Sequence, residues 1–491
     1  MAPSGGESCH TFRGWTPRVG ALALVTLCTL FANGILLAQA APLVPEHPWD
    51  VPSAKQAFKV PPRPAPALNL DPAKLYTLSE LVNIAEQNNP ETRVAWQYAK
   101  ARAADLGIAR SSLYPTLAAV AMAGTWRENF LLGPVFARQT VETFSPVLVL
   151  DYIIFDFGER SQQIAISKNN LLAANFQFND IHRNVIFQVM ETYYRLLDSK
   201  GQEDAAEANL KNAETVQQAA EARLDHGLAT SPDVLEARSA AAQADYDLQA
   251  AIGATEIAHG DLATVLGIPP TTQFQVESIE SIMMPDSIAD TVESSIDNAL
   301  SQRPDLMERV AELRAAGAEV KAARRTYFPT LRMDGREGLA RSYGDQIGLR
   351  GVYSPTQGTW SAAISLNWTL FDGLAREHRL ARAHAAARQA AASVDAVRDQ
   401  VEDQVWAAYS TARTALRQQK AAAALLKAAT ESYNAALQSY NYGVRTQIDV
   451  VSAQRTLADA RTADVNARTQ LLTGLAALAY HTGDLLYAKR P

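Results

Sequence analysis

The sequence predicts a membrane protein of the α+β class, built from two copies of one unit that each join a pair of β-strands to a long helix. Landmarks recur in order at a spacing of 214 to 216 residues: Tyr114-Pro115-Thr116-Leu117 returns as Phe328-Pro329-Thr330-Leu331, and Phe155-Asp156 returns as Phe371-Asp372. In the second copy a strictly alternating segment precedes a very long segment without proline, and the first copy repeats this order. The fold can therefore be described once and doubled.

The composition is that of an ordinary folded protein, with a net charge of −7 over 491 residues and 47% hydrophobic residues. It shows no basic excess, so we expect no nucleic-acid partner. Residues 1–40 are predicted to be a secretory signal, with two arginines at the start, an apolar core at 19–37 and a cleavage site at Ala38-Gln39-Ala40. The alternative is an N-terminal membrane anchor. Asn33 and Gly34 argue against it, because they interrupt the apolar core.

Both cysteines, Cys9 and Cys28, lie in this predicted signal. The mature chain is then expected to have no disulfide and no thiolate metal site. Cys28 lacks small residues before it, so we also expect no N-terminal acylation. No other segment approaches the roughly 18 apolar residues of a membrane-spanning helix. If the mature protein crosses a membrane, it must do so with β-strands.

The chain divides into a leader, two repeats and a linker. Residues 41–75 contain nine prolines and are predicted to be an extended leader. The first repeat, 76–267, comprises helices broken at Asn88-Asn89-Pro90, a β-hairpin at 115–155, a long helix at 158–226 and a return helix at 230–267. A linker at 268–292 leads to the second repeat, 293–487, with a helix, a hairpin at 329–371, a long helix at 373–442 and a return helix at 446–482.

The strand prediction rests on residues 359–370, which alternate between an apolar and a polar face. The apolar face carries Trp360, Ala362, Ile364, Leu366, Trp368 and Leu370. The partner strands are predicted near 116–126 and 330–342, with loops at about 128–142 and 343–358. Two strands in each copy give four strands in the chain.

The long helices carry an apolar stripe with coiled-coil spacing. It consists of Phe178, Ile181, Val185, Val189 and Leu196 in the first copy, and of Val394, Val397, Val401, Val405 and Ala412 in the second. A single chain cannot cover such long stripes, and four strands cannot close on themselves in lipid. A ring of several chains resolves both problems, although the sequence does not fix their number.

The order of these landmarks resembles the outer-membrane efflux proteins of the TolC type, over roughly residues 76–487. The resemblance implies a homotrimer in which four transmembrane strands per chain form a twelve-stranded barrel in outer-membrane lipid, continuing into a long periplasmic α-helical barrel. It implies a passive exit duct for efflux or type I secretion in the Gram-negative cell envelope. The implied partners are a periplasmic adaptor protein and an inner-membrane pump of the RND, ABC or MFS type.

The resemblance also implies a gate where the long helices turn back. By position, Tyr440, Arg445 and Asp449 match gate residues of the second copy, and Asp233 matches the partner of the tyrosine. Pro232 offers no hydroxyl to the arginine, so Thr230 or Ser231 would replace it, and Ser452 stands where some relatives carry a second aspartate. Gly227 and Gly443 are expected to reverse the chain with positive φ, in turns that an adaptor would contact.

Other chemistry-bearing residues have simpler interpretations. Asp156 and Asp372 are expected to cap the following helices, the alternative being general acids. The histidines are scattered, and the His378–His384 spacing does not place two metal ligands on one helix face. Trp360, Trp368 and Tyr152 are predicted to form an aromatic girdle at the membrane interface. The alternative for these aromatic residues is ordinary packing against a neighbouring strand.

Two alternatives belong to other classes of function. One is a secreted coiled-coil scaffold without channel activity, against which the apolar face of the strands argues. The other is an enzyme, for which the sequence offers no nucleophile, metal or cofactor motif. We therefore expect a channel that needs no cofactor.

Overall fold

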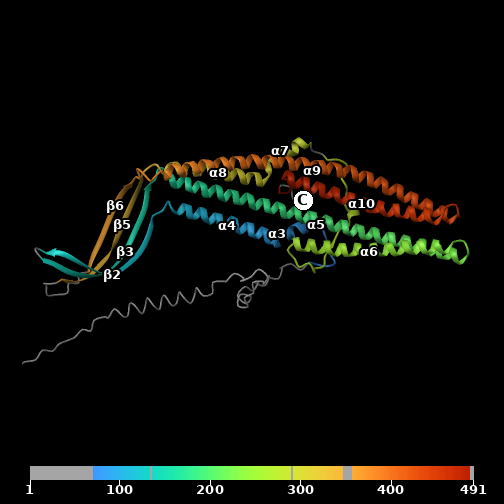
Figure 1. Cartoon of the computed structure of the whole chain (residues 1–491), viewed down its shortest axis with the longest axis horizontal. Helices are drawn as coiled ribbons and strands as arrows, with labels where there is room; N and C mark the ends of the chain where they lie inside the picture. Colours follow the sequence, from blue (N-terminus) through green and yellow to red (C-terminus); the bar gives the residue numbers. More distant parts are fainter. Residues whose placement is uncertain (1–69, 133–134, 289–290, 347–355, 487–491) are drawn as a thin grey trace, which may run out of the picture. The chain divides into compact units, whose positions relative to one another are not determined.

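The computed structural model describes residues 70–132, 135–288, 291–346 and 356–486, which belong to the compact unit formed by residues 68–491 (Figure 1). The predicted signal and most of the predicted leader lie outside the described residues. Two copies of the same helix and strand order follow one another, so the predicted two-repeat α+β fold is confirmed.

The first repeat begins with two short helices whose starts are fixed by their caps. Helix α3 spans Leu78–Asn88 and opens on a capping box in which Thr77 and Glu80 exchange hydrogen bonds. Helix α4 spans Pro90–Ser111; Asn89 caps it, and Pro90 takes the first helical position, where no amide hydrogen is needed. In the second repeat, α7 spans Val292–Gln302 and α8 spans Pro304–Arg325.

The long helices α5, Glu159–Asp225, and α9, Ala375–Asn441, each contain 67 residues and therefore extend for roughly 100 Å. Each turns back into a return helix, α6 at Ser231–Val265 and α10 at Gln447–Thr482. Buried members of the predicted stripe are Val185, Val189, Leu196, Val394, Val401, Val405 and Ala412. The strands and the helical turns lie at opposite ends of the long helices (Figure 1).

The short and return helices of each repeat meet end to end beside a long helix. In the first repeat the side-chain amide of Asn89 donates to the carbonyl of Val265 at 3.1 Å. In the second repeat Arg303 donates to the carbonyl of His481 at 3.5 Å. At the first of these joints Gly267 has a φ of 76°, and a Cβ there would lie 2.8 Å from the carbonyl oxygen of Asn88, so only glycine fits.

Four antiparallel strands form one sheet in the order β2-β3-β5-β6. Their bounds are Thr116–Leu132, Val135–Phe155, Thr330–Gln346 and Thr356–Asn367. The pair Arg127–Thr140 of the first hairpin and the pair Arg341–Thr356 of the second are equivalent by the repeat. The two hairpins therefore have the same strand register. The change of spacing from 214 to 216 residues lies between the paired residues, at the connection of each hairpin.

The predicted loop at 128–142 is wrong, because β2 and β3 remain paired up to Leu132 and Val135. The Gly133-Pro134 dipeptide between them is a sequence signal for a turn. The prediction of a long loop overlooked this signal. The predicted loop at 343–358 is shorter than expected at both ends, since β5 reaches Gln346 and β6 begins at Thr356; residues 347–355 lie outside the described residues.

The predicted strand at 359–370 ends early, at Asn367. Asn367 pairs with Thr330, so the next partner would be Pro329, which has no amide hydrogen for the ladder. The indole of Trp368 instead donates to the carbonyl of Tyr327 at 3.1 Å. A proline at the start of one strand thus ends the other.

The main apolar core surrounds the middle of α5 and takes in the linker between the repeats. The linker contributes the buried side chains of Ile268, Phe274, Val276 and Ile279. Strand β4, Gln275–Val276, pairs in parallel with β1, Leu75–Tyr76, at the end of the predicted leader. The linker shows no clear hydrophobic periodicity because its backbone is irregular, yet its apolar side chains belong to the core.

A buried ionic cluster joins the two repeats near this core. Arg183 of α5 is only 1% exposed; it contacts Asp180, lies 3.7 Å from Asp305 of α8, and donates to the carbonyl of Tyr480 at 3.2 Å. Arg303 binds Asp305 through two bonds of 3.0 and 2.6 Å. Burial favours protonation of Asp305, but the bonds from Arg303, the charges of Arg303 and Arg183 and a bond from the backbone of Leu306 together lower the pKa of this carboxyl group.

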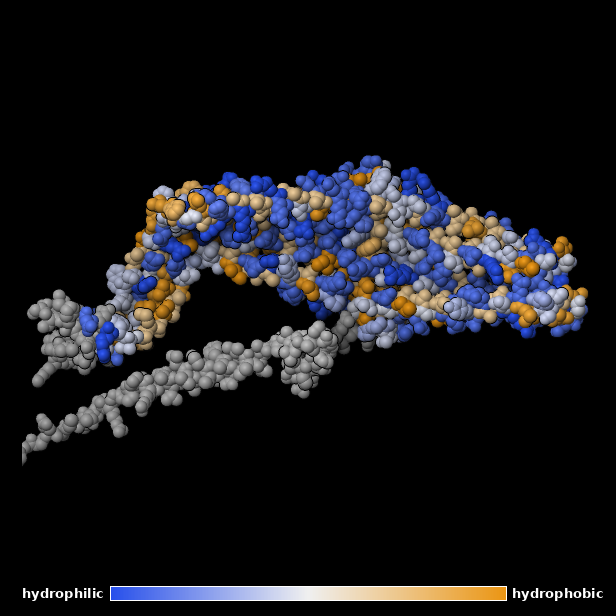
Figure 2. Space-filling model, in the orientation of Figure 1, coloured by the Kyte–Doolittle hydropathy of each residue, from blue (hydrophilic) through white to orange (hydrophobic). Residues whose placement is uncertain are grey.

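In the part of the chain that the structure describes, no helix combines the length and the apolar character that crossing a membrane requires. Hydrophobic surface gathers on the strands and at the helical turns, and smaller patches interrupt the mainly hydrophilic helices (Figure 2).

Candidate functional site

Each long helix ends in the same tight reversal. In the first copy the amides of Gly227 and Leu228 donate to the carbonyls of Leu224 and Arg223 at 2.8 and 2.7 Å. In the second copy the equivalent bonds, from residues 443 and 444 to residues 440 and 439, both measure 2.9 Å. The φ angles of Gly227 and Gly443 are 71° and 75°, as predicted for residues that reverse the chain.

The two aspartates predicted for the gate fix the starts of the return helices. Asp233 accepts bonds from the backbone amide and the hydroxyl of Thr230, at 2.8 and 2.6 Å. Asp449 accepts the same bonds from Thr446, at 2.9 and 2.8 Å. These bonds lower the pKa of both carboxyl groups, so both turns carry a fixed negative charge at neutral pH.

Tyr440 forms the contact between the two hairpins of helices. The residue is 6% exposed, and its main-chain carbonyl accepts a 2.7 Å hydrogen bond from Arg223 of α5. The guanidinium of Arg223 also lies 4.3 Å from the centre of the tyrosine ring, within cation–π range. Burial raises the pKa of Tyr440; the nearby charge of Asp233 raises it further, and Arg223 opposes both effects.

The other predicted gate residues surround this contact. Arg445 is exposed, and its charge contributes to the lowered pKa of Asp449. Thr230 directs its hydroxyl to Asp233. The roles that the resemblance implies for Tyr440, Arg445, Asp449, Asp233 and Thr230 remain predictions.

Sequence reasoning missed Arg223, although the repeat offered a signal. The position equivalent to Arg223 in the second copy is Ser439, and the position equivalent to Tyr440 in the first copy is Leu224. Each long helix therefore supplies one member of the pair. Comparing positions 223 and 224 with positions 439 and 440 would have shown that the arginine occurs in the first copy and the tyrosine in the second.

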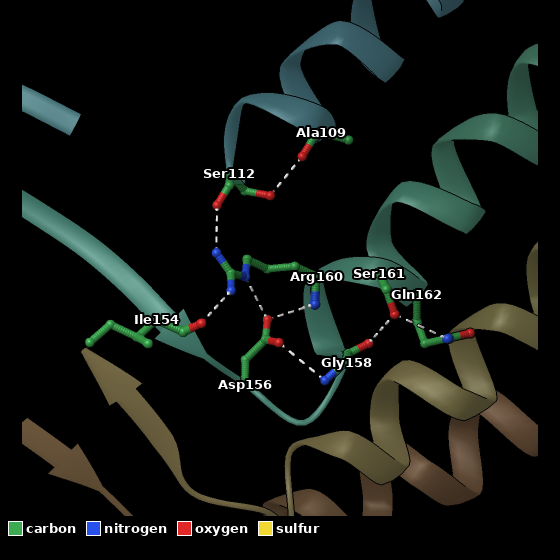
Figure 3. Close-up of polar contacts among 8 residues, drawn as sticks. All are labelled: Ala109, Ser112, Ile154, Asp156, Gly158, Arg160, Ser161 and Gln162. Carbon is green, nitrogen blue, oxygen red and sulfur yellow. Dashed lines mark hydrogen bonds and ion pairs between the residues drawn. The ribbon is translucent and has the colours of Figure 1, made fainter. Parts of the chain in front are cut away.

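At the other end of α5, Asp156 fixes the step from strand to helix (Figure 3). It accepts bonds from the amides of Gly158 and Arg160, at 3.1 and 2.8 Å, and from the side chain of Arg160 at 2.9 Å. Arg160 in turn donates to the carbonyls of Ser112 and Ile154. The predicted capping role is thus confirmed for Asp156, and the sequence prediction missed its arginine partner.

The second copy has the same contact between an arginine and an aspartate at the step from strand to helix. Arg376 lies 3.3 Å from Asp372 and donates to the carbonyl of Leu370 at 3.1 Å. Two successive residues have positive φ in each copy, Phe157 and Gly158 in the first and Gly373 and Leu374 in the second. A sharp left-handed turn, held by an arginine and an aspartate, therefore sets the angle between strands and helices in both copies.

The aromatic residues predicted for the membrane interface differ in their surroundings. Trp360 is 82% exposed and pairs with Glu337 across the sheet. Trp368 is also exposed and lies just beyond β6, with its indole bonded to Tyr327. Tyr152 is half-buried and pairs with Met333. Their interfacial role remains a prediction.

Among the described residues, no group of three or more histidine, aspartate or glutamate side chains is placed to hold a metal ion. His384, one of the two histidines considered above, lies 3.4 Å from the guanidinium of Arg324 on α8.

Comparisons with known proteins identify the family of the chain. The family model described as "Outer membrane efflux protein" matches residues 81–268 and 295–484, one match for each repeat. The chain is 30% identical over 425 residues to Protein CyaE of Bordetella pertussis (strain Tohama I), covering 86% of this chain and 87% of that protein. It is 23% identical over 411 residues to Outer membrane efflux protein BepC of Brucella suis biovar 1, covering 83% and 85%.

The fold itself matches a crystal structure of a membrane protein from Pseudomonas aeruginosa with a TM-score of 0.73, at 22% identity, over 87% of this chain and 99% of that one. The two repeats and their helical turns define a channel protein of the Gram-negative outer membrane. The chain belongs to the outer membrane efflux protein family. These matches support the channel reading and not the secreted scaffold.

Proposed function

We propose that this chain is one subunit of a homotrimeric exit duct that is closed at its periplasmic end by contacts between the two helical hairpins. The observation that carries the proposal is the contact of Arg223 with Tyr440, because it joins α5 to α9 where both helices turn back. Solutes would enter there from a periplasmic adaptor and an inner-membrane pump of the RND, ABC or MFS type. The duct itself performs no reaction.

The sheet supports assembly into a ring. Strands β2 and β6 lie at its two edges, and each has a single strand neighbour in the described chain. An unpaired strand edge is costly in lipid, where no water replaces the missing partners. In a closed ring, β6 of one copy would pair with β2 of the next.

The helical turns support docking of a partner protein. Leu228, Tyr442 and Val444 are exposed apolar side chains next to Gly227 and Gly443. Clustered apolar residues at the end of a hairpin are typical of a protein contact. We assign this surface to the adaptor.

Replacing Arg223 by alanine should raise the resting conductance of the reconstituted channel. The change removes both the cation–π contact and the hydrogen bond to Tyr440. A loss of about 1.4 kcal/mol would increase the open fraction about tenfold. Single-channel recording in planar bilayers measures this fraction directly.

Arg195→Ala is the matched control, because Arg195 lies on the same helix, is exposed, and makes long ion pairs of 3.8 and 3.6 Å with Glu191 and Asp261. It should leave the conductance unchanged. An Arg223→Ala channel that stays as closed as the unmodified one would refute the proposed contact.

Replacing Asp449 by asparagine should reduce the preference of the channel for cations. The asparagine oxygen can still accept the bond from the amide of Thr446, so the turn persists while its charge is lost. Three carboxylates around a narrow lumen concentrate cations, and their loss weakens that effect. The reversal potential across a KCl gradient reports it.

Asp233→Asn provides the comparison, since Asp233 occupies the same capping box in the first copy. If only the second-copy residue faces the lumen, the reversal potential should shift clearly for Asp449→Asn and little for Asp233→Asn. Equal shifts, or none, would contradict the assignment.

A further inference from the structure

The two faces of the four-stranded sheet differ in character. One face, here called the apolar face, carries most of the large exposed apolar side chains of the strands, which are Leu117, Phe144, Leu148, Leu339, Trp360, Ile364 and Leu366. The opposite face, here called the polar face, carries serine, threonine and asparagine along β6, and its large exposed apolar side chains lie on β2. In the proposed ring the apolar face meets lipid, so the polar face lines the lumen.

Charge on the polar face is confined to one place. Within positions 116–126, 141–153, 330–340 and 357–367, the charged side chains of this face are Asp151 on β3 and Arg332, Asp334 and Arg336 on β5. They occupy three successive positions of this face along the pairing of β3 with β5, and Asp334 lies directly opposite Asp151. We call these four side chains the charged band.

The arginines of the charged band compensate an unfavourable pair of aspartates. Two carboxylates directly opposite each other on neighbouring strands repel. Arg332 lies 3.7 Å from Asp151, and both side chains are partly exposed. On β5, an arginine stands two residues before and two residues after Asp334, at a rise of about 7 Å on the same face. The charged band therefore has two charges of each sign and no net charge.

The charged band lies within the depth predicted for the membrane. On β6 its partners are the small residues Ser361, Ala363 and Ser365, which follow Trp360 and precede Trp368. A charge at this depth is costly on a surface that meets lipid and far less costly on one that meets water. Depth and pairing therefore both favour a water-filled lumen for the charged band, with no bulky neighbour on β6 to cover it.

The repeat indicates that the hairpins do not need these charges to form. The equivalent positions in the other copies of the strands are uncharged, namely Ala118, Val120 and Met122 on β2 and Asn367 on β6. Both hairpins nevertheless have the same register. A role in folding the strands therefore does not account for the charged band.

We propose that the charged band lines the lumen of the ring and determines which ions and charged solutes pass the membrane-spanning part of the duct. The inference rests on the proposed function and adds to it a second selective position, separate from the helical turns. Because the charged band is balanced, solutes of either sign pass it, and the preference for cations is left to the turns. Removing the charges of one sign unbalances it.

Reversal potentials in planar bilayers test the proposed role. Asp334→Asn leaves a net positive charge in each copy, so the ratio of cation to anion permeability should fall about twofold in about 0.1 M salt. The fall should be larger in about 0.01 M salt, where the Debye length is about 30 Å instead of about 10 Å. Arg336→Gln should change the ratio by a similar factor in the opposite direction. A general loosening of the sheet would not produce shifts of opposite sign.

Glu337→Gln is the matched control, because Glu337 follows Arg336 on β5 but pairs with Trp360 on the apolar face. It removes the same charge as Asp334→Asn and should leave the permeability ratio unchanged. An equal shift for Glu337→Gln, or no shift for Asp334→Asn and Arg336→Gln, would overturn the proposed role of the charged band. If Asp449→Asn still shifts the potential in that case, the proposed function stands. An unmodified protein that conducts no ions would overturn both.

Thiol labelling gives a second measurement of which face meets the lumen. Cys9 and Cys28 lie in the predicted signal, so an introduced cysteine would be the only one in the mature chain. In reconstituted channels, Arg336→Cys should react with a cationic, membrane-impermeant methanethiosulfonate, and the permeability ratio should return towards that of the unmodified channel. Glu337→Cys should not react. Reaction of Glu337→Cys but not of Arg336→Cys would show that the sheet faces the other way and refute the inference.

Discussion

Replacing Arg183 by methionine should destabilise the protein by about 3–5 kcal/mol per subunit, because it removes one partner of a buried ionic cluster and leaves the others charged. Arg183 contacts Asp180, approaches Asp305, and binds the carbonyl and ring of Tyr480. Methionine matches its length but supplies no hydrogen bond. Burial already raises the pKa of Asp180, and the loss of Arg183 would raise it further.

The effect is measured as the temperature at which the purified protein loses its helical circular dichroism at a fixed heating rate. Arg398→Met is the control, since Arg398 makes an exposed ion pair of 3.7 Å with Asp395 on α9. Its cost should be below about 0.5 kcal/mol. Adding Asp180→Leu to Arg183→Met should recover part of the loss. Equal unfolding temperatures for the two arginine variants would contradict the structural role of Arg183.

Replacing Gly201 by leucine should destabilise the protein by about 2–3 kcal/mol, because α5 and α10 would have to separate. Glycine in the interior of a helix ordinarily costs about 1 kcal/mol relative to alanine, so its presence in a 67-residue helix needs a reason. That reason is the approach of Val465, with Ile279 next to it. The unfolding temperature reports this change as well.

Gly317→Ala on α8 is the matched control, since a Cβ at Gly317 meets no atom within 4 Å. It should stabilise the protein slightly, by up to about 1 kcal/mol. Adding Val465→Ala to Gly201→Leu should restore part of the lost stability. A Gly201→Leu protein as stable as the Gly317→Ala protein would show that the helices are not closely packed at this point.

The repeat and its local signals predicted most of the fold. The offset of the landmarks located both hairpins and both pairs of helices, because one unit written twice must fold twice in the same way. Capping residues such as Thr77 and glycines such as Gly227 and Gly443 marked where helices begin and reverse. These signals are local, so they can be recognised in the sequence without knowledge of the rest of the structure.

Some errors came from features that depend on distant partners. The end of β6 is set by Pro329 on the neighbouring strand, and the irregular linker is held by the core around α5. Arg160 and Arg376 stand four residues after Asp156 and Asp372, so their spacing was a local signal that the prediction did not use. Arg223 was missed because its partner, Tyr440, lies in the other repeat.

The buried cluster at Arg183 also divides α5 into two unequal arms. The arm towards the turn, 42 residues from Arg183 to Asp225, extends for roughly 60 Å, and the arm towards the strands, 24 residues to Glu159, for roughly 36 Å. Arg183 therefore joins α5 to the second repeat at a point nearer the strands than the turn, and the longer arm is held again further along by the close contact of Gly201 with Val465.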